Sequence, residues 1–97
     1  MSAYAVAQIE IYDPEEYKKY LAGFLSIFRR YEGELLATSS CETEVIEGEW
    51  AYPRTVIMKF PRMKDARYWH GDPDYRKLAE HRQRSAKANL VLVEGIS

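Results

Sequence analysis

The sequence predicts a single α+β domain spanning residues 1–97, with the order strand, helix, strand, strand, broken helix, strand. Residues 3–12 alternate between aliphatic and other side chains, which is typical of a strand. Two Asp-Pro pairs each precede apolar residues at helical spacing. Because both crossovers must be right-handed, these elements form a four-stranded antiparallel sheet with helices on one face, the ferredoxin-like βαββαβ fold.

The first helix is predicted from its start signal and from its apolar face. Asp13 can cap the helix, and Pro14 has the backbone angle that the first helical position needs. One broad apolar face follows, formed by Tyr17, Tyr20, Leu21, Phe24, Leu25, Phe28 and Tyr31. Gly33 is expected to end the helix in a left-handed conformation.

The second and third strands are predicted on either side of a turn at Glu47-Gly48-Glu49. Residues 34–46 are predicted to form one long edge strand, in which Cys41 serves as a small packing residue. Residues 55–60 are nearly all apolar, as an interior strand requires, and Pro61 ends them. A single cysteine excludes an internal disulfide.

The second half of the chain predicts two helices and a last strand. Residues 63–70 form a short helix that breaks at Gly71, and Asp72-Pro73 starts the next one. The apolar face of that helix comprises Tyr75, Leu78, Ala79, Arg82 and Ala86, which places His81 on the solvent side. Residues 90–93 form the last strand.

One face of the predicted sheet has no helices over it. Tyr4, Val6 and one set of side chains from residues 56–60 point to that face. An exposed apolar face is unfavourable in a domain with so small a core. We therefore expect a homodimer in which two copies pack through their open sheet faces, as a dimeric α+β barrel.

The composition excludes some classes of partner. The net charge of −1 lacks the basic excess that nucleic-acid binding needs. Residues 1–53 hold ten acidic and four basic residues, whereas residues 54–87 hold four acidic and ten basic ones. This asymmetry fits two solvated faces, or complementary surfaces. The sequence contains no apolar run of the roughly 20 residues that span a membrane. With no signal peptide visible, the cytoplasm is the expected location.

Both tryptophans fall in segments that also carry polar side chains, Glu47–Trp50 and Trp69–Tyr75. Trp69 either belongs to the core, which we favour, or stacks on a ligand. Trp50 either plugs the end of the sheet or lines a pocket. His70 suits the negative end of its helix, and general acid–base catalysis is the alternative role.

Arg82 is the other candidate for binding, because it lies on an apolar helix face. An arginine that points inward needs an anionic partner. A structural salt bridge with Glu47, Glu94 or Glu10 is the favoured interpretation, and a carboxylate ligand is the alternative. Together with Tyr75, these residues are predicted to surround any pocket.

No group of residues reaches the pattern of a known catalytic or metal site. The two histidines are on different helices and lack metal-ligand spacing, so no metal is predicted. No glycine-rich phosphate loop is present, and neither histidine has an apolar setting for haem. The sequence therefore predicts no cofactor.

Several residues in their order resemble a bacterial family known as domain of unknown function 1330. They are Asp13-Pro14, Glu47-Gly48-Glu49-Trp50, Phe60-Pro61, Ala66, Trp69, Asp72 to Tyr75, Arg82 and the closing Leu-Val-Glu-Gly. The resemblance covers residues 4–95 and implies a dimeric α+β barrel without an assigned activity. Asp72 stands where the family pattern has serine, and Glu32-Gly33 replaces Gly-Gly; both keep the local cap or turn chemistry.

Three functions are compatible with these observations. The first is an uncharacterised dimeric protein whose pocket takes a small organic acid. The second is a cofactor-independent enzyme, similar by fold to monooxygenases or isomerases, with His70 as the proton-transfer group. The third is a structural or interaction module in which the aromatic residues serve packing alone.

Overall fold

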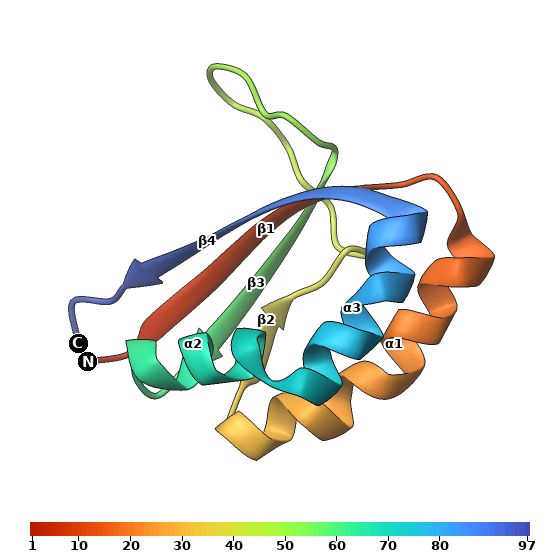
Figure 1. Ribbon diagram of the computed structural model, residues 1–97. Coiled ribbons are helices and arrows are strands. Elements are labelled where there is room, and N and C mark those ends of the chain that lie inside the picture. The colour runs from red at the N-terminus through yellow and green to blue at the C-terminus, as the bar shows by residue number, and fades with distance from the viewer.

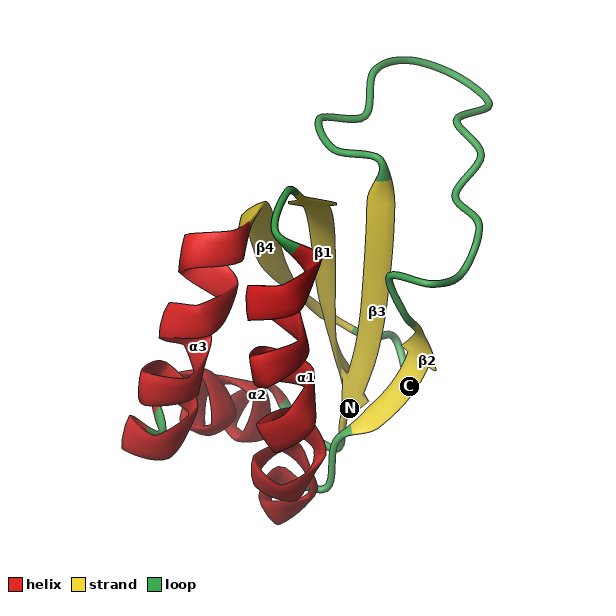
Figure 2. Cartoon of the chain, turned by 90° about the vertical axis from the view of Figure 1, so that its right-hand side faces the viewer, coloured by secondary structure: helices red, strands yellow, loops and turns green.

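Two layers make up the domain: an antiparallel sheet, and helices on one of its faces (Figures 1 and 2). This computed structural model describes all residues, 1–97. The elements are β1 (Ala3–Ile11), α1 (Pro14–Phe28), the 3-10 turn η1 (Arg29–Tyr31), β2 (Glu34–Ala37), β3 (Arg54–Phe60), α2 (Met63–Gly71), α3 (Pro73–Ser85) and β4 (Ala86–Glu94). The sheet order β2-β3-β1-β4 with antiparallel pairs confirms the predicted ferredoxin-like fold.

The core lies between the sheet and the helices. On β1, alternate residues turn toward the helices, and they are small at Ala3, Ala5 and Ala7. Small side chains there leave room for the large rings of the helices. These rings and their neighbours form one buried cluster, which includes Tyr17, Tyr20, Phe24, Phe28, Phe60, Trp69 and Tyr75.

Both Asp-Pro pairs start helices, as the sequence predicts. A side-chain oxygen of Asp13 accepts a hydrogen bond from the backbone N–H of Glu16 at 3.2 Å. Asp72 accepts one from the backbone N–H of Asp74 at 2.7 Å. Each carboxylate satisfies a backbone donor that the first helical turn leaves free, and it lies at the positive end of the helix dipole.

The turn after α1 differs from the prediction for Gly33. The left-handed residue is Glu32, with φ of 57°, and not the glycine that follows it. Gly33 is required for space, because a Cβ atom there would overlap the ring of Phe28. Glycine at this position thus lets the chain pass close to a core side chain.

The prediction of a strand over residues 34–46 was wrong, since β2 ends at Ala37. The backbone N–H of Cys41 bonds to the carbonyl of Thr38 at 3.0 Å, which turns the chain away from β3. The chain then forms a long loop before β3, and the tip of this loop lies beyond the end of the sheet (Figures 1 and 2). The hydroxyl of Thr43 still donates to that of Thr55, on β3, at 2.9 Å, but the backbone pairing with β3 ends at Ala37. Cys41 is exposed on the turn, so its predicted packing role was also wrong.

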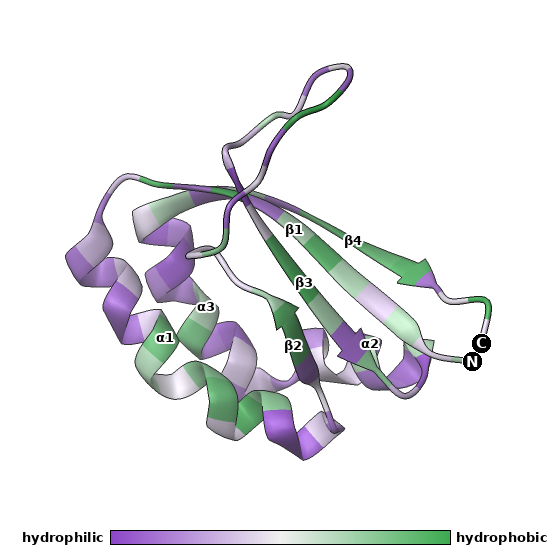
Figure 3. Ribbon diagram, turned by 180° about the vertical axis from the view of Figure 1, so that it is seen from behind, coloured by the Kyte–Doolittle hydropathy of each residue, from purple (hydrophilic) through white to green (hydrophobic).

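The face of the sheet opposite the helices remains open and partly apolar. Hydrophobic residues run along β1, β3 and β4 in the view from behind (Figure 3). Val6 is paired with Ile57 on one side and with Val91 on the other. Val91 and Val93 are 56% and 47% exposed.

None of the three α-helices has the length and apolar character that crossing a bilayer requires.

Candidate functional site

A small cavity of about 80 Å³ lies between the helices and the sheet. Its wall is largely hydrophobic, and α1, β1, β3, α3 and β4 all contribute side chains to it. The polar atoms in this wall come from few residues, and they include Arg82, Tyr20, Tyr75 and Trp69. A mostly apolar cavity with a few converging polar groups is the usual form of a small-molecule site.

The side chain of Arg82 reaches this cavity from α3. Its guanidinium carbon lies 5.8 Å from the centre of the Tyr20 ring, within range for a cation–π contact. Arg82 is partly buried, yet it forms no ion pair with any carboxylate of the chain. The predicted salt bridge with Glu47, Glu94 or Glu10 is therefore absent. The cation faces an apolar cavity with only an aromatic ring as its partner.

Two buried phenols meet in the wall beside Arg82. The hydroxyl groups of Tyr20, on α1, and Tyr75, on α3, are hydrogen-bonded at 2.8 Å. Burial raises the pKa of Tyr20, and the adjacent Tyr75 raises it further, so this phenol is neutral at physiological pH. In the sequence, Tyr20 is recognisable only as part of the apolar helix face, because no local pattern shows that its hydroxyl meets Tyr75.

The mouth of the cavity lies between the first turns of α1 and the segment that follows β2. Tyr17, Leu21 and Ser39 line both the cavity and an open depression outside it. Burial raises the pKa of the Tyr17 phenol, while Ser39 and the positive charge of Arg82 act in the opposite direction. A ligand that enters here would pass Tyr17 before it reaches Arg82.

Trp69 lies at the inner end of this aromatic group and is 1% exposed. The ring centre of Trp69 lies 4.4 Å from the ring centre of Tyr75 and 5.3 Å from that of Phe60. The indole nitrogen is buried and has no hydrogen-bond partner. Trp69 therefore belongs to the core, which is the favoured interpretation from the sequence, and one side of it also lines the cavity.

His70 lies next to this group but does not line the cavity. Its ring is exposed at the end of α2, with its centre 5.8 Å from that of Tyr75. Desolvation lowers the pKa of His70, and the charges of Arg82 and Arg76 lower it further. The imidazole is consequently neutral at pH 7 and is able to accept a proton.

Trp50 and Glu47 lie elsewhere, beside a shallow depression formed by the loop after β2. The indole N–H of Trp50 donates to the hydroxyl of Thr55, on β3, at 3.2 Å. The structure thus brings Trp69, Tyr75 and Arg82 together at one cavity. It places Trp50 and Glu47 at a separate surface beyond the end of the sheet.

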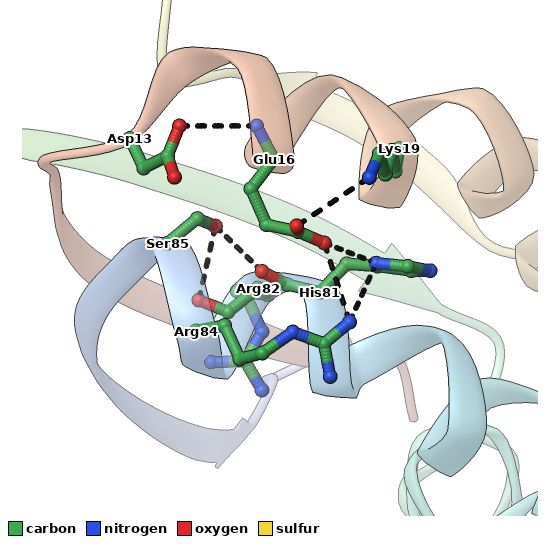
Figure 4. A network of polar contacts seen from close by, with 7 residues as sticks. All are labelled: Asp13, Glu16, Lys19, His81, Arg82, Arg84 and Ser85. Carbon is green, nitrogen blue, oxygen red and sulfur yellow. Dashed lines mark hydrogen bonds and ion pairs between the residues drawn. The ribbon is translucent and has the colours of Figure 1, made fainter.

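A polar network that sequence analysis missed joins α1 to α3 (Figure 4). Glu16 contacts Nδ1 of His81, and it also pairs with Arg84 at 3.3 Å and Lys19 at 3.5 Å. The hydrogen bond from His81 is the main cause of the lowered pKa of Glu16. The predicted solvation of His81 was wrong because α1 packs beside α3, and helical spacing on α3 alone cannot show this neighbour.

The described residues include no cluster of three metal-ligating side chains.

These features define a two-layer α+β protein with a small apolar cavity under its helices. The chain belongs to the family described as Domain of unknown function (DUF1330), whose sequence model matches residues 2–96. The match confirms the resemblance found in the sequence. A search of the curated proteins finds no match.

Solved structures share the fold at low sequence identity. A protein of unknown function from Rhodopseudomonas palustris is 17% identical, with a TM-score of 0.76 over 99% of this chain and 83% of that one. SnoaB from Streptomyces nogalater, a cofactor-independent oxygenase, is 14% identical, with a TM-score of 0.68 over 99% and 94%. A dimeric ferredoxin-like protein of unknown function from Jannaschia sp. CCS1 is 11% identical, with a TM-score of 0.64 over 98% and 100%. At these identities, the likeness concerns the fold alone.

Proposed function

We propose that this protein binds a small organic acid in the cavity between its helices and its sheet. The observation that carries the proposal is the guanidinium of Arg82, which is partly buried at an apolar cavity and has no carboxylate partner in the chain. A partly buried cation without a counterion is less favourable than a paired one, and a carboxylate matches the donor geometry of arginine. The surrounding apolar wall would hold the hydrocarbon part of the acid.

Thermal unfolding in the presence of small carboxylates tests this proposal. A ligand at 100 times its dissociation constant stabilises the folded state by about 2.7 kcal/mol, which raises the melting temperature measurably. The stabilisation should disappear in Arg82→Gln and persist in the control Arg76→Gln, an exposed arginine on the same helix. Equal stabilisation of both variants would contradict binding through Arg82.

We also propose that the protein acts as a homodimer joined through its open sheet faces. Val6, Ile57, Val91 and Val93 give this face its apolar character. The dimeric protein from Jannaschia sp. with the same fold supports the proposal. Light scattering after size exclusion should give twice the chain mass of 11.4 kDa.

We further propose that the protein is located in the cytoplasm. The free, exposed thiol of Cys41 supports this location, because the cytoplasm keeps thiols reduced.

A second candidate is an enzyme that acts on the bound acid without a cofactor. The neutral imidazole of His70 beside Tyr75 favours it, since a neutral histidine can take up a proton. A cofactor-independent oxygenase also shares the fold. In this case His70→Ala should abolish turnover of a bound acid and leave its binding unchanged. A structural or interaction module, the third function compatible with the sequence, would bind none of the acids.

A further inference from the structure

The polar groups in the cavity wall include several hydrogen-bond donors that lack an acceptor. Arg82 carries five N–H donors and no acceptor, and no carboxylate of the chain pairs with it. Trp69 has a single N–H donor, which is buried without a partner. Leaving a buried donor unpaired costs about 1–3 kcal/mol. A ligand for this cavity would therefore supply acceptors.

The two phenols add a further donor. When two hydroxyl groups bond to each other, one proton is shared between them and the proton of the accepting hydroxyl stays free. Tyr20 and Tyr75 form such a pair, and neither hydroxyl has another hydrogen-bond partner. Both side chains are buried, so water has little access to the free proton. The pair consequently presents one O–H donor near Arg82, whose guanidinium lies over the Tyr20 ring.

The cavity volume limits the size of the ligand. The cavity measures about 80 Å³. An engineered apolar cavity of about 150 Å³ accommodates benzene, with its six carbon atoms. By this comparison the cavity takes about three to four non-hydrogen atoms in addition to the carboxylate held by Arg82 at its edge. The ligand is thus an acid with a chain of only a few carbons.

We infer that the preferred ligand is a short-chain 2-oxo carboxylic acid, such as 2-oxobutanoate. This inference rests on the proposed function and specifies its ligand. The carboxylate pairs with Arg82, and the neighbouring keto oxygen accepts the free proton of the Tyr20–Tyr75 pair. A keto oxygen satisfies a donor and brings no donor of its own. A hydroxyl group at the same carbon would add one. The short alkyl end fills the apolar part of the cavity.

Isothermal titration calorimetry with butanoate, 2-oxobutanoate and 2-oxooctanoate tests the inference. For the wild type, 2-oxobutanoate should bind about 2- to 13-fold tighter than butanoate, the range for one added hydrogen bond. The double variant Tyr20→Phe/Tyr75→Phe keeps the shape of the wall and should bind both acids with equal affinity. The longer acid should bind more weakly than 2-oxobutanoate.

The outcomes separate the two proposals. Equal binding of butanoate and 2-oxobutanoate by the wild type would overturn the 2-oxo acid preference and leave acid binding intact. A preference that survives in the double variant would exclude the tyrosine pair as its cause. Tighter binding of 2-oxooctanoate would overturn the limit on chain length. If none of the three acids binds, the proposed function fails, and the inference fails with it.

Discussion

The hydroxyl oxygens of Tyr20 and Tyr75 lie 2.8 Å apart, although 55 positions separate these residues in the sequence. This bond links α1 to α3 through two residues that line the cavity. The same pair therefore contributes to packing between helices and to the polarity of the candidate site. Its effect on stability can be measured independently of any ligand.

Removing both of these hydroxyl groups should destabilise the fold by less than the sum of the two single removals. Tyr20→Phe or Tyr75→Phe leaves the remaining buried hydroxyl unpaired, which costs about 1–3 kcal/mol of unfolding free energy. The double variant loses both polar groups and should cost less than the sum of the single changes. Urea unfolding of the wild type, the two single variants and the double variant gives the coupling energy between the two hydroxyl groups. Strictly additive costs would show that the bond has no energetic role.

Gly33→Ala should destabilise the protein, whereas Gly71→Ala should not. A methyl group at position 33 would overlap the Phe28 ring, so this buried ring would have to move, at a cost of about 1–3 kcal/mol. No atom lies within 4 Å of the same group at position 71, the last residue of α2. Chemical denaturation compares the two variants. Equal stabilities would mean that the Phe28 ring moves without cost.

Replacing Glu16 by glutamine should reduce stability in a pH-dependent manner. Bonds to His81 and Arg84 hold the folded-state pKa of Glu16 below its ordinary value of 4.5. A lowered pKa contributes stability above pH 4.5, and this contribution is lost as the pH falls through the folded-state pKa. The difference in stability between wild type and Glu16→Gln should thus be largest near neutral pH and should vanish in acid. Unfolding curves at several pH values measure it, and a constant difference would contradict the network's role.

Val91→Glu should convert the proposed dimer to monomers. The side chain is 56% exposed in the single chain, so a charge there is tolerated in the monomer but would be buried between two sheet faces. Tyr68→Glu is the matched control, since Tyr68 is 63% exposed on α2 and lies away from that face. Light scattering compares the masses. A dimer that persists in Val91→Glu would show that the open face is not the interface.

Most of the fold follows from local sequence signals, because these act through neighbouring residues. Asp13-Pro14 and Asp72-Pro73 start helices by satisfying donors in their own first turns. Residues 38–46 show the limit of such signals. Their composition suits a strand, but the turn from Thr38 to Cys41 ends the pairing with β3, and the residues beyond it lack a partner strand because β3 begins only at Arg54. The absence of that partner is a property of the sheet and is not visible within the segment.

The candidate site was predictable only in part for the same reason. Spacing on α3 placed Arg82 and Tyr75 on one face, and the cavity lies beside that face. Tyr20 and Tyr17 approach from α1, and their polar roles depend on how the two helices pack. The contact between Glu16 and His81 has the same origin. Interactions across helices are set by tertiary packing, which the periodicity of a single helix does not encode.

The alternation of side chains along β1 separates two properties of the protein. Ala7 lines the cavity, while its neighbours Val6 and Gln8 turn to the opposite side of the sheet. Substitutions at odd-numbered positions can therefore reshape the cavity while the outer surface stays the same, and substitutions at even-numbered positions do the reverse. Relatives with this fold could accordingly change what they hold and how they assemble by independent mutational steps on a single strand.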